Sequence, residues 1–440
     1  MADKQQNDPV SRLLQGMATR VEREVVPPDQ RFITQRAALH QRRRKYRLLT
    51  VAAAVIVVVG GIAAGVIIPG GSPTRHGRPG QSPGVASYPI RFGNVRLVVK
   101  NLPAIQKTTT TIARSRITTL RLPVITPNYS SIAFGDAHVW VLEHTGDSAS
   151  GPCGQLVEVD AASATVTGSV PIALCPDAVA YGAGSVWVLS FQIDVTGYQL
   201  VQVDPSTLTV VSTITLDGGV DGVTPQGDTG AKYLFVTVDG NDVIAAIQGQ
   251  AGNAELIEVD ATSGTTIRSV PVPLVDGPAT GLGTNNSAVW VGTANGWVLS
   301  LNPQSGALST GRRLGTRVAS LSASNSGIWV TVNLPVPSNA AYPGLDTLRL
   351  DPTTGVIEND TGLPMVFVAT DGTSVWALSS APPYQSAAGL VGRVDPTTGQ
   401  LNEQAELPVQ GYNTPDTLGV YDGAAWVIND GVGTLTKVSP

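Results

Sequence analysis

The chain has 440 residues, which exceeds an ordinary single domain, and its 48 glycines and 31 prolines indicate many turns. The net charge of −5 conceals a division: residues 1–47 and 69–114 are basic, whereas residues 115–440 carry 10 Lys and Arg against 28 Asp and Glu. A body this acidic excludes nucleic acid as the expected partner, and the parts of the chain must be considered separately.

Residues 1–47 are polar and end in a basic cluster at residues 42–47. Apolar residues recur at helical spacing before a Pro-Pro pair at 27–28, namely Val10, Leu13, Leu14, Met17 and Val21. The segment is therefore either a solvated tail or a helix that docks a cytoplasmic regulator.

Residues 48–68 contain no charged side chain over 21 positions, enough to cross the hydrocarbon core as a helix. Basic residues precede this segment and none follows it directly, which places the N-terminus in the cytoplasm. A cleaved signal peptide is the competing interpretation, but its positive region is normally short and 47 residues come before this one. We therefore expect an uncleaved single-pass anchor in the cell membrane, with the lipid bilayer as a partner and the rest of the chain extracytoplasmic.

Residues 69–114 are rich in Gly, Pro, Ser and Thr and contain no acidic residue, which predicts a flexible stalk. Within this stalk, residues 88–100 can form a strand of their own.

One short apolar phrase with an aromatic residue at its centre recurs through residues 115–440. Its aromatic residues are Trp140, Trp187, Trp290, Trp329, Trp376 and Trp426, with Phe235 as a degenerate seventh copy. The spacings of 39 to 55 residues are the mark of a repeat architecture. We expect the repeated tryptophans to pack between repeats rather than to bind a ligand.

A second phrase follows each aromatic residue and ends in an acidic residue and a turn. Its turn positions are Asp160, Asp204, Asp260, Asn302, Asp351, Asp395 and Ser439, several of them followed by Pro and then Thr-Gly. Pro, Asp and Gly each favour a turn for a separate physical reason, so we interpret these aspartates as turn residues rather than a ring of metal ligands.

Each repeat divides into four short strands rich in Val, Ile and Thr, called A to D, which in the first repeat cover residues 131–135, 138–143, 155–160 and 165–172. Seven such repeats predict an all-β, seven-bladed β-propeller over residues 115–440. The last repeat ends after its third strand, and residues 117–123 resemble the end of a repeat. We therefore expect this N-terminal strand to close the last blade, which leaves no open edge.

Residues 184–188 (GSVWV) and 394–399 (VDPTTG) resemble the repeats of bacterial seven-bladed propellers of the YVTN and virginiamycin B lyase-like group. The resemblance implies the propeller fold, and in members with lyase activity a histidine base and a metal-binding carboxylate. The two histidines of the body, His138 and His144, lie in no matching motif. We therefore assign no catalytic residue, metal or cofactor.

The function must then lie in what differs between repeats. The B–C and D–A connections vary in length and share one face, with the longest B–C insertions predicted at residues 143–154, 239–254 and 333–346. Polar candidates for ligand binding on that face are Asp147, Asp177, Asp194, Tyr198, Asp221, Asp276, Asp346, Tyr384, Tyr412 and Asp416. Cys153 and Cys175 flank two connections of the same face, and an extracytoplasmic location favours a disulfide between them.

These observations indicate a membrane-anchored, extracytoplasmic module that binds or senses an unknown ligand or protein through its loop-rich face. Two alternatives stay open. One is a lyase or hydrolase of the virginiamycin B lyase-like group, which needs convergent acid, base and electrophilic groups around the central channel. The other is a purely structural scaffold.

Overall fold

The computed structural model describes 88–92, 95–99, 109–122, 131–144, 154–173, 175–191, 197–217, 234–248, 253–309, 311–335, 344–379, 389–407, 417–429 and 433–440. These residues belong to one compact unit, Val85–Pro440. The predicted tail, membrane span and much of the stalk lie outside the described ranges. Within those ranges, no helix has the length and apolar character that crossing a membrane requires.

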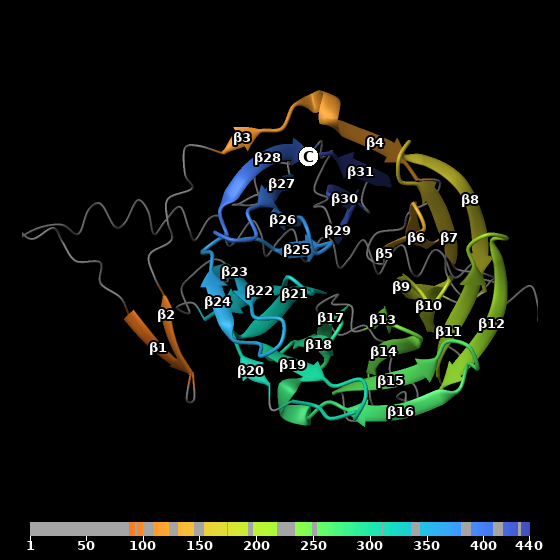
Figure 1. Ribbon diagram of the computed structural model, residues 1–440, viewed down its shortest axis with the longest axis horizontal. Helices are drawn as coiled ribbons and strands as arrows, with labels where there is room; N and C mark the ends of the chain where they lie inside the picture. The colour runs from red at the N-terminus through yellow and green to blue at the C-terminus, as the bar shows by residue number, and fades with distance from the viewer. Residues whose placement is uncertain are drawn as a thin grey trace, which may run out of the picture. The chain divides into compact units, whose positions relative to one another are not determined.

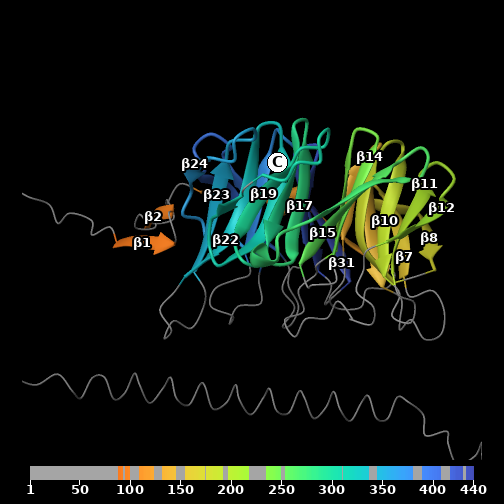
Figure 2. The same cartoon turned by 90° about the horizontal axis from the view of Figure 1, so that it is seen from below.

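Seven antiparallel sheets follow one another around a ring (Figures 1 and 2). Blade 1 comprises β5 (Ile132–Gly135), β6 (His138–His144), β7 (Gly154–Asp160) and β8 (Thr165–Ile172). Blade 2 comprises β9 (Cys175–Gly182), β10 (Ser185–Phe191), β11 (Tyr198–Asp204) and β12 (Thr209–Leu216). Blade 3 comprises β13 (Phe235–Asp239), β14 (Asp242–Gln248), β15 (Ala254–Asp260) and β16 (Thr266–Pro271). A short 3-10 helix, η3 (Leu274–Asp276), leads to blade 4.

Blade 4 comprises β17 (Ala279–Asn285), β18 (Ala288–Thr293), β19 (Trp297–Leu301) and β20 (Arg312–Arg313). Blade 5 comprises β21 (Arg317–Ser324), β22 (Gly327–Leu334), β23 (Gly344–Leu350) and β24 (Ile357–Asp360). Blade 6 comprises β25 (Phe367–Thr370), β26 (Val375–Ser379), β27 (Gly389–Val394) and β28 (Leu401–Leu407). Blade 7 comprises β29 (Thr417–Tyr421), β30 (Ala424–Asn429), β31 (Thr434–Val438) and the N-terminal β4 (Ile117–Arg121).

The predicted closure of the ring is confirmed. β4 pairs antiparallel with β31, from Ile117 opposite Val438 to Arg121 opposite Thr434. A further segment, residues 109–112, precedes η1 (Arg114–Arg116) and adds β3 (Thr110–Thr111) in parallel to the outer edge of β28. Ile112 is buried there, so chain before the predicted boundary at residue 115 packs on the propeller. Where one strand was expected in the stalk, the structure has two, β1 (Tyr88–Phe92) and β2 (Val95–Val99), which pair antiparallel.

The repeated tryptophans form the core between blades, as predicted. Trp140 of blade 1 packs with Val188 of blade 2, and Trp426 of blade 7 packs with Val139 of blade 1. The solvent-exposed fraction of the six repeated tryptophans is at most 3%. Each sits in its own apolar cluster at one blade junction, so the sequence period corresponds to a packing unit.

The seventh copy of the phrase was misplaced. Phe235 lies on the inner strand β13, and the position equivalent to tryptophan on β14 is filled by Ile244, which is buried against Val289 and Val291 of blade 4. Consequently the insertion predicted at residues 239–254 is wrong: it spans the A–B turn and all of β14. Ile244 is also apolar and buried, so a hydrophobic residue occupies this blade junction although the aromatic signal is absent.

The acidic turns behave as predicted. In the C–D turn of blade 6 the Asp395 carboxylate accepts the N–H groups of Thr397 and Thr398, both at 2.8 Å, and Gly399 N–H donates to the Asp395 carbonyl. Gly399 has φ of +70°, where glycine carries no steric cost. Such turn bonds favour the charged form and lower the pKa of five turn aspartates, Asp160, Asp204, Asp260, Asp351 and Asp395.

Antiparallel order gives the ring two different faces (Figure 2). The turn face carries the A–B and C–D turns, such as residues 136–137 and 161–164 of blade 1. The loop face is the opposite end of the strands, where the B–C and D–A connections begin and end. On the loop face the described connections include the B–C turn of blade 4 and the D–A links at 272–278, 314–316 and 361–366.

Candidate functional site

The predicted ligand-binding residues divide into two groups. Asp147, Asp194, Asp221, Tyr384, Tyr412 and Asp416 lie outside the described residues. The remaining four, Asp177, Tyr198, Asp276 and Asp346, lie at strand ends or connections of the loop face, on blades 2, 3 and 5. All four are buried, with exposed fractions of 3% to 9%. They therefore lie beneath the connections, and their role in ligand binding stays a prediction.

Tyr198 and Asp177 belong to one polar group where blade 2 meets blade 3. Tyr198 begins β11, and its ring lies 5.9 Å from that of Phe191, the last residue of β10. Burial raises the pKa of Tyr198 to about 12, assisted by the negative charge of Asp177 and opposed by a hydrogen bond from the backbone of Gln248. The tyrosine is thus a neutral hydroxyl that joins two blades beneath the loop face.

Asp346 forms a second polar group with Asp360. Its carboxylate accepts the N–H of Thr347 at 2.7 Å, and its side chain hydrogen-bonds to Asp360 at the end of β24. Burial, and then the contact with Asp360, raise the pKa of Asp346 to about 8. The hydrogen bond between Asp346 and the exposed Asp360 ties β23 to β24 where the D–A link begins.

The D–A link that follows is fixed by buried hydroxyls. Thr361 Oγ1 donates to the Thr347 carbonyl at 2.7 Å, Thr347 Oγ1 to the Leu363 carbonyl at 2.9 Å, and Thr331 Oγ1 to the Val366 carbonyl at 2.9 Å. Together with the Asp346–Asp360 contact they hold residues 361–366 on blade 5. This part of the loop face is a rigid platform, as a binding surface requires.

The stability of the protein is expected to fall as pH rises from 5 to 8 because of Asp346. Its native pKa of about 8 exceeds the unfolded value of 3.8, so its contribution is complete below about pH 4 and is lost as pH rises. We expect Asp346→Asn, which keeps a donor toward Asp360 and cannot ionise, to remove this pH-dependent loss of stability. Thermal unfolding at several pH values measures this.

Asp351→Asn is the matched control. The pKa of Asp351 is lowered, chiefly by its hydrogen bond with the Thr354 side chain, so its contribution is lost only in acid. This variant should keep the wild-type slope between pH 5 and 8. A wild-type slope in Asp346→Asn as well would show that Asp346 is ionised throughout that range.

Asp276 lies in the D–A link between blades 3 and 4, in η3. Burial raises its pKa. The neighbouring Val275 has an exposed fraction of 69%, and its carbonyl accepts a hydrogen bond from Asn295 Nδ2 at 3.0 Å across to the B–C turn of blade 4. Here two connections of the loop face contact each other directly and present an apolar side chain.

Sequence reasoning missed a recurring polar position at the loop-face end of the B strands. Five of the six repeated tryptophans are followed, three residues later, by a buried polar residue: Glu143, Ser190, Thr293, Ser379 and Asn429. The exception is Trp329, which has Val332 at that position. Glu143, fully buried, accepts a hydrogen bond from Gln155 Nε2 at 2.6 Å. The signal was present at a fixed offset from the aromatic residue, but only strand register shows that these side chains belong to one level of the ring.

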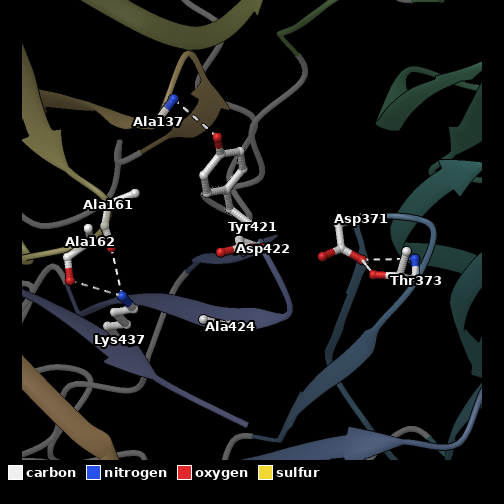
Figure 3. Close-up of a pocket in the computed structure, with 9 residues that line it drawn as sticks. All are labelled: Ala137, Ala161, Ala162, Asp371, Thr373, Tyr421, Asp422, Ala424 and Lys437. Atoms are coloured by element: carbon white, nitrogen blue, oxygen red, sulfur yellow. Dashed lines mark hydrogen bonds between the residues drawn. The ribbon is translucent and has the colours of Figure 1, made fainter.

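A hollow of about 570 Å³ lies instead on the turn face, where blades 6, 7 and 1 meet (Figure 3). Lys437 Nζ donates to the carbonyls of Ala161 and Ala162 at 2.7 and 3.3 Å, and lies 5.4 Å from the ring centre of Trp426. Tyr421 Oη accepts the Ala137 N–H at 3.1 Å. These polar groups are engaged in joining the last blade to the first.

The carboxylates of the same hollow come from A–B turns. Asp371 accepts N–H groups from Thr373, Ser374 and Gly423, the last at 2.8 Å across to blade 7. These and other hydrogen bonds outweigh burial and lower its pKa. Asp422, which also lines the hollow, has φ of +49° at the tip of its turn. The Thr373 hydroxyl also donates to Asp371, at 2.8 Å within the same turn (Figure 3). These contacts help to hold the last blades of the ring together.

His138 is the histidine of the propeller body whose side-chain contacts the structure describes. His138 Nε2 lies 3.5 Å from Glu158 Oε1, and its ring packs 5.9 Å from that of Trp140 on the turn side of blade 1. Among the described residues no group of three or more His, Cys, Asp or Glu side chains could hold a metal ion.

Comparison with known proteins identifies the fold. No family model matches the chain, and no curated protein sequence matches it. Among solved structures, the Pan2 WD40 domain of Neurospora crassa is similar, with 13% identity and a TM-score of 0.55 over 75% of this chain and 98% of that one. A Kuenenia stuttgartiensis hydrazine synthase chain has 13% identity and a TM-score of 0.52, covering 73% and 97%. A chain of the Mitotic Checkpoint Complex has 10% identity and a TM-score of 0.52, covering 80% and 98%. At these identities the similarity establishes a seven-bladed β-propeller and nothing of its activity.

Proposed function

We propose that the protein is a membrane-anchored, extracytoplasmic propeller of the YVTN and virginiamycin B lyase-like kind that binds a protein partner through its loop face. Propellers commonly serve as protein-binding or scaffold modules. In this proposal residues 48–68 are the anchor, the basic tail before them can dock a cytoplasmic regulator, and the ligand-binding residues are those of the loop-face connections.

The observation that carries the proposal is the difference between the two faces. On the turn face, aspartates such as Asp351 and Asp395 satisfy their own turns, and Asp371 and Lys437 join neighbouring blades. On the loop face, buried groups such as Tyr198 and the protonated Asp346 fix the bases of connections that differ from blade to blade. A rigid base beneath irregular connections is how scaffold folds present binding residues.

Shortening the loop-face connections is expected to abolish partner binding while the fold survives. Residues 335–343 link β22 to β23, and residues 380–388 link β26 to β27. Each link can be cut to three residues, the length of the connection between β18 and β19. The measurement is recovery of the proteins that co-purify with the detergent-extracted full-length chain. The matched control is Asp395→Asn on the turn face, which should leave recovery unchanged.

If both truncated proteins still recover the partner and melt at the wild-type temperature, the binding site lies on the turn face or in the tail. That outcome would contradict the proposal.

The extracytoplasmic location predicts a disulfide between Cys153 and Cys175. Cys175 begins β9 at the loop face, Cys153 lies outside the described residues, and no free cysteine occurs among those described. A loop of this length stabilises by roughly 3 kcal/mol on the chain-entropy model. Thiol labelling of the denatured, unreduced protein should detect no free cysteine. Two free thiols would count against both the bond and the oxidising compartment.

A lyase or hydrolase of the same propeller group is the second candidate. It is favoured by the resemblance of the repeats. Activity that depends on His138 or His144 would support it.

A further inference from the structure

The outer strand of a propeller blade leaves one row of backbone groups unpaired, and such edges invite pairing with other chains. Most outer strands described here carry a protecting feature. Pro171 interrupts β8, and β16 has Arg268 and Pro271; β20 is a pair of arginines, β24 holds Glu358 and Asp360, and β4 ends in Arg121. These charges, prolines and short lengths are the usual devices against edge pairing.

β12 is the exception among the described outer strands. Its eight residues, TVVSTITL, include no charge, proline or glycine. Val210 and Val211 have exposed fractions of 44% and 59%, and no described strand pairs with its outer side. A long, uncharged, β-branched edge with exposed valines is suited to accept another strand.

The chain itself shows how such an edge is filled. On blade 6 residues 109–112, here called the strap, run parallel to β28 with Thr110 opposite Glu403. Ile112 N–H donates to the Gln404 carbonyl at 2.8 Å, and Thr109 Oγ1 donates to the Leu401 carbonyl at 3.3 Å. The strap is an extended segment of three threonines and one isoleucine, so an outer blade edge of this protein binds uncharged, β-branched chain.

The same backbone groups are exposed on blade 2. Both outer strands, β12 and β28, have a bulge at the equivalent place. The pairing of β12 with β11 shifts between Gln202 and Val203, and the pairing of β28 with β27 shifts between Arg393 and Val394. In this register Thr213, opposite Val201, corresponds to Gln404, opposite Gly392. Since the Gln404 carbonyl faces outward to Ile112, the N–H and C=O of Thr213 face outward as well.

We propose that the edge of β12 is a second binding surface, separate from the loop face, which accepts an extended, uncharged, β-branched segment of a partner protein by strand addition. The strand itself carries no charge that would pair with a charged peptide, and the strap shows the type of sequence that an outer edge binds. Main-chain hydrogen bonds supply the affinity, and contact with Val210 and Val211 adds apolar burial.

The test uses the full-length protein and a fluorescein-labelled peptide with the sequence of residues 108–113, TTTTIA. Fluorescence anisotropy should show saturable binding. Thr213→Pro should weaken this binding at least tenfold, because proline removes the N–H that points away from β11 and so breaks no hydrogen bond within the blade. Ser169→Pro, at the corresponding position of β8, is the matched control and should leave binding unchanged. Val211→Lys, which leaves the backbone intact, should also weaken binding and covers the case in which Thr213→Pro fails to fold.

Absence of saturable binding, or binding that neither Thr213→Pro nor Val211→Lys reduces, would overturn the proposal. So would a concentration-dependent dimer of the unlabelled protein, seen in sedimentation velocity and dissolved by Thr213→Pro, because the edge would then belong to a second copy.

Discussion

Removal of residues 1–122 is expected to unfold the propeller, whereas removal of residues 1–108 is expected to leave it folded. The longer deletion takes away β4, whose five residues pair with β31 and complete blade 7. It also removes Leu122, buried among Val139, Trp426 and Leu435 where blade 7 meets blade 1. The shorter deletion stops before Thr109, the first described residue of the strap.

The expected loss of stability is large because β4 contributes both to strand pairing within blade 7 and to packing between blades 7 and 1. Without β4 the outer side of β31 becomes an open edge, and the main-chain contact between Ser439 and Arg116 disappears. Each fully buried aliphatic side chain contributes about 1.5–3 kcal/mol, and the longer deletion removes two buried ones, Ile112 and Leu122. Together with the lost strand pairing, this is comparable to the lower part of the roughly 5–15 kcal/mol stability of a typical protein.

Thermal and urea unfolding of the two truncated proteins, followed by tryptophan fluorescence, measures the difference. A third protein that lacks residues 1–113 keeps β4 and loses only the strap, with Ile112 and its bond to Gln404. It should fall between the other two. Equal midpoints for all three would show that the ring does not depend on the N-terminal strand for closure.

The fold could be predicted because blade packing and turns impose residue types at fixed spacing. A tryptophan at most blade junctions and an Asp-Pro turn after the third strand are local signals, and both occur where expected, at Trp376 and Asp395. The copy in blade 3 was misassigned because Ile244 does the packing there and Phe235, the nearest aromatic residue, belongs to the preceding strand.

The candidate site could be predicted only as a face of the ring. Asp177, Tyr198, Asp276 and Asp346 do lie on the loop face, but their burial follows from contacts between strands and blades that no local pattern records. The hydrogen bond between Asp346 and Asp360 depends on β23 pairing with β24, and the hollow at Lys437 depends on the first and last blades meeting. Such features arise from register and closure, which sequence spacing does not specify.

Trp376→Ala is expected to destabilise the propeller by about 3–5 kcal/mol, the range for a large aromatic side chain in a core. Trp376 is fully buried on β26 and packs on Ala425 and Val427 of blade 7. Its Nε1–H donates to the Gly423 carbonyl at 2.9 Å across the junction. Truncation would open a cavity between two blades and leave that carbonyl without its donor, so cavity and hydrogen-bond losses add.

Trp297→Ala is the matched control for the same measurement. Trp297 begins β19 and is the one tryptophan outside the repeated position; it is only partly buried, at the edge of the cluster between blades 3 and 4. Its loss should shift the unfolding midpoint by less than half as much, and Trp376→Phe should recover part of the stability by refilling the space without the hydrogen bond. The loss of stability should therefore be largest for Trp376→Ala, smaller for Trp376→Phe and smallest for Trp297→Ala. Equal losses for the two alanine variants would mean that the repeated tryptophan is not what joins the blades.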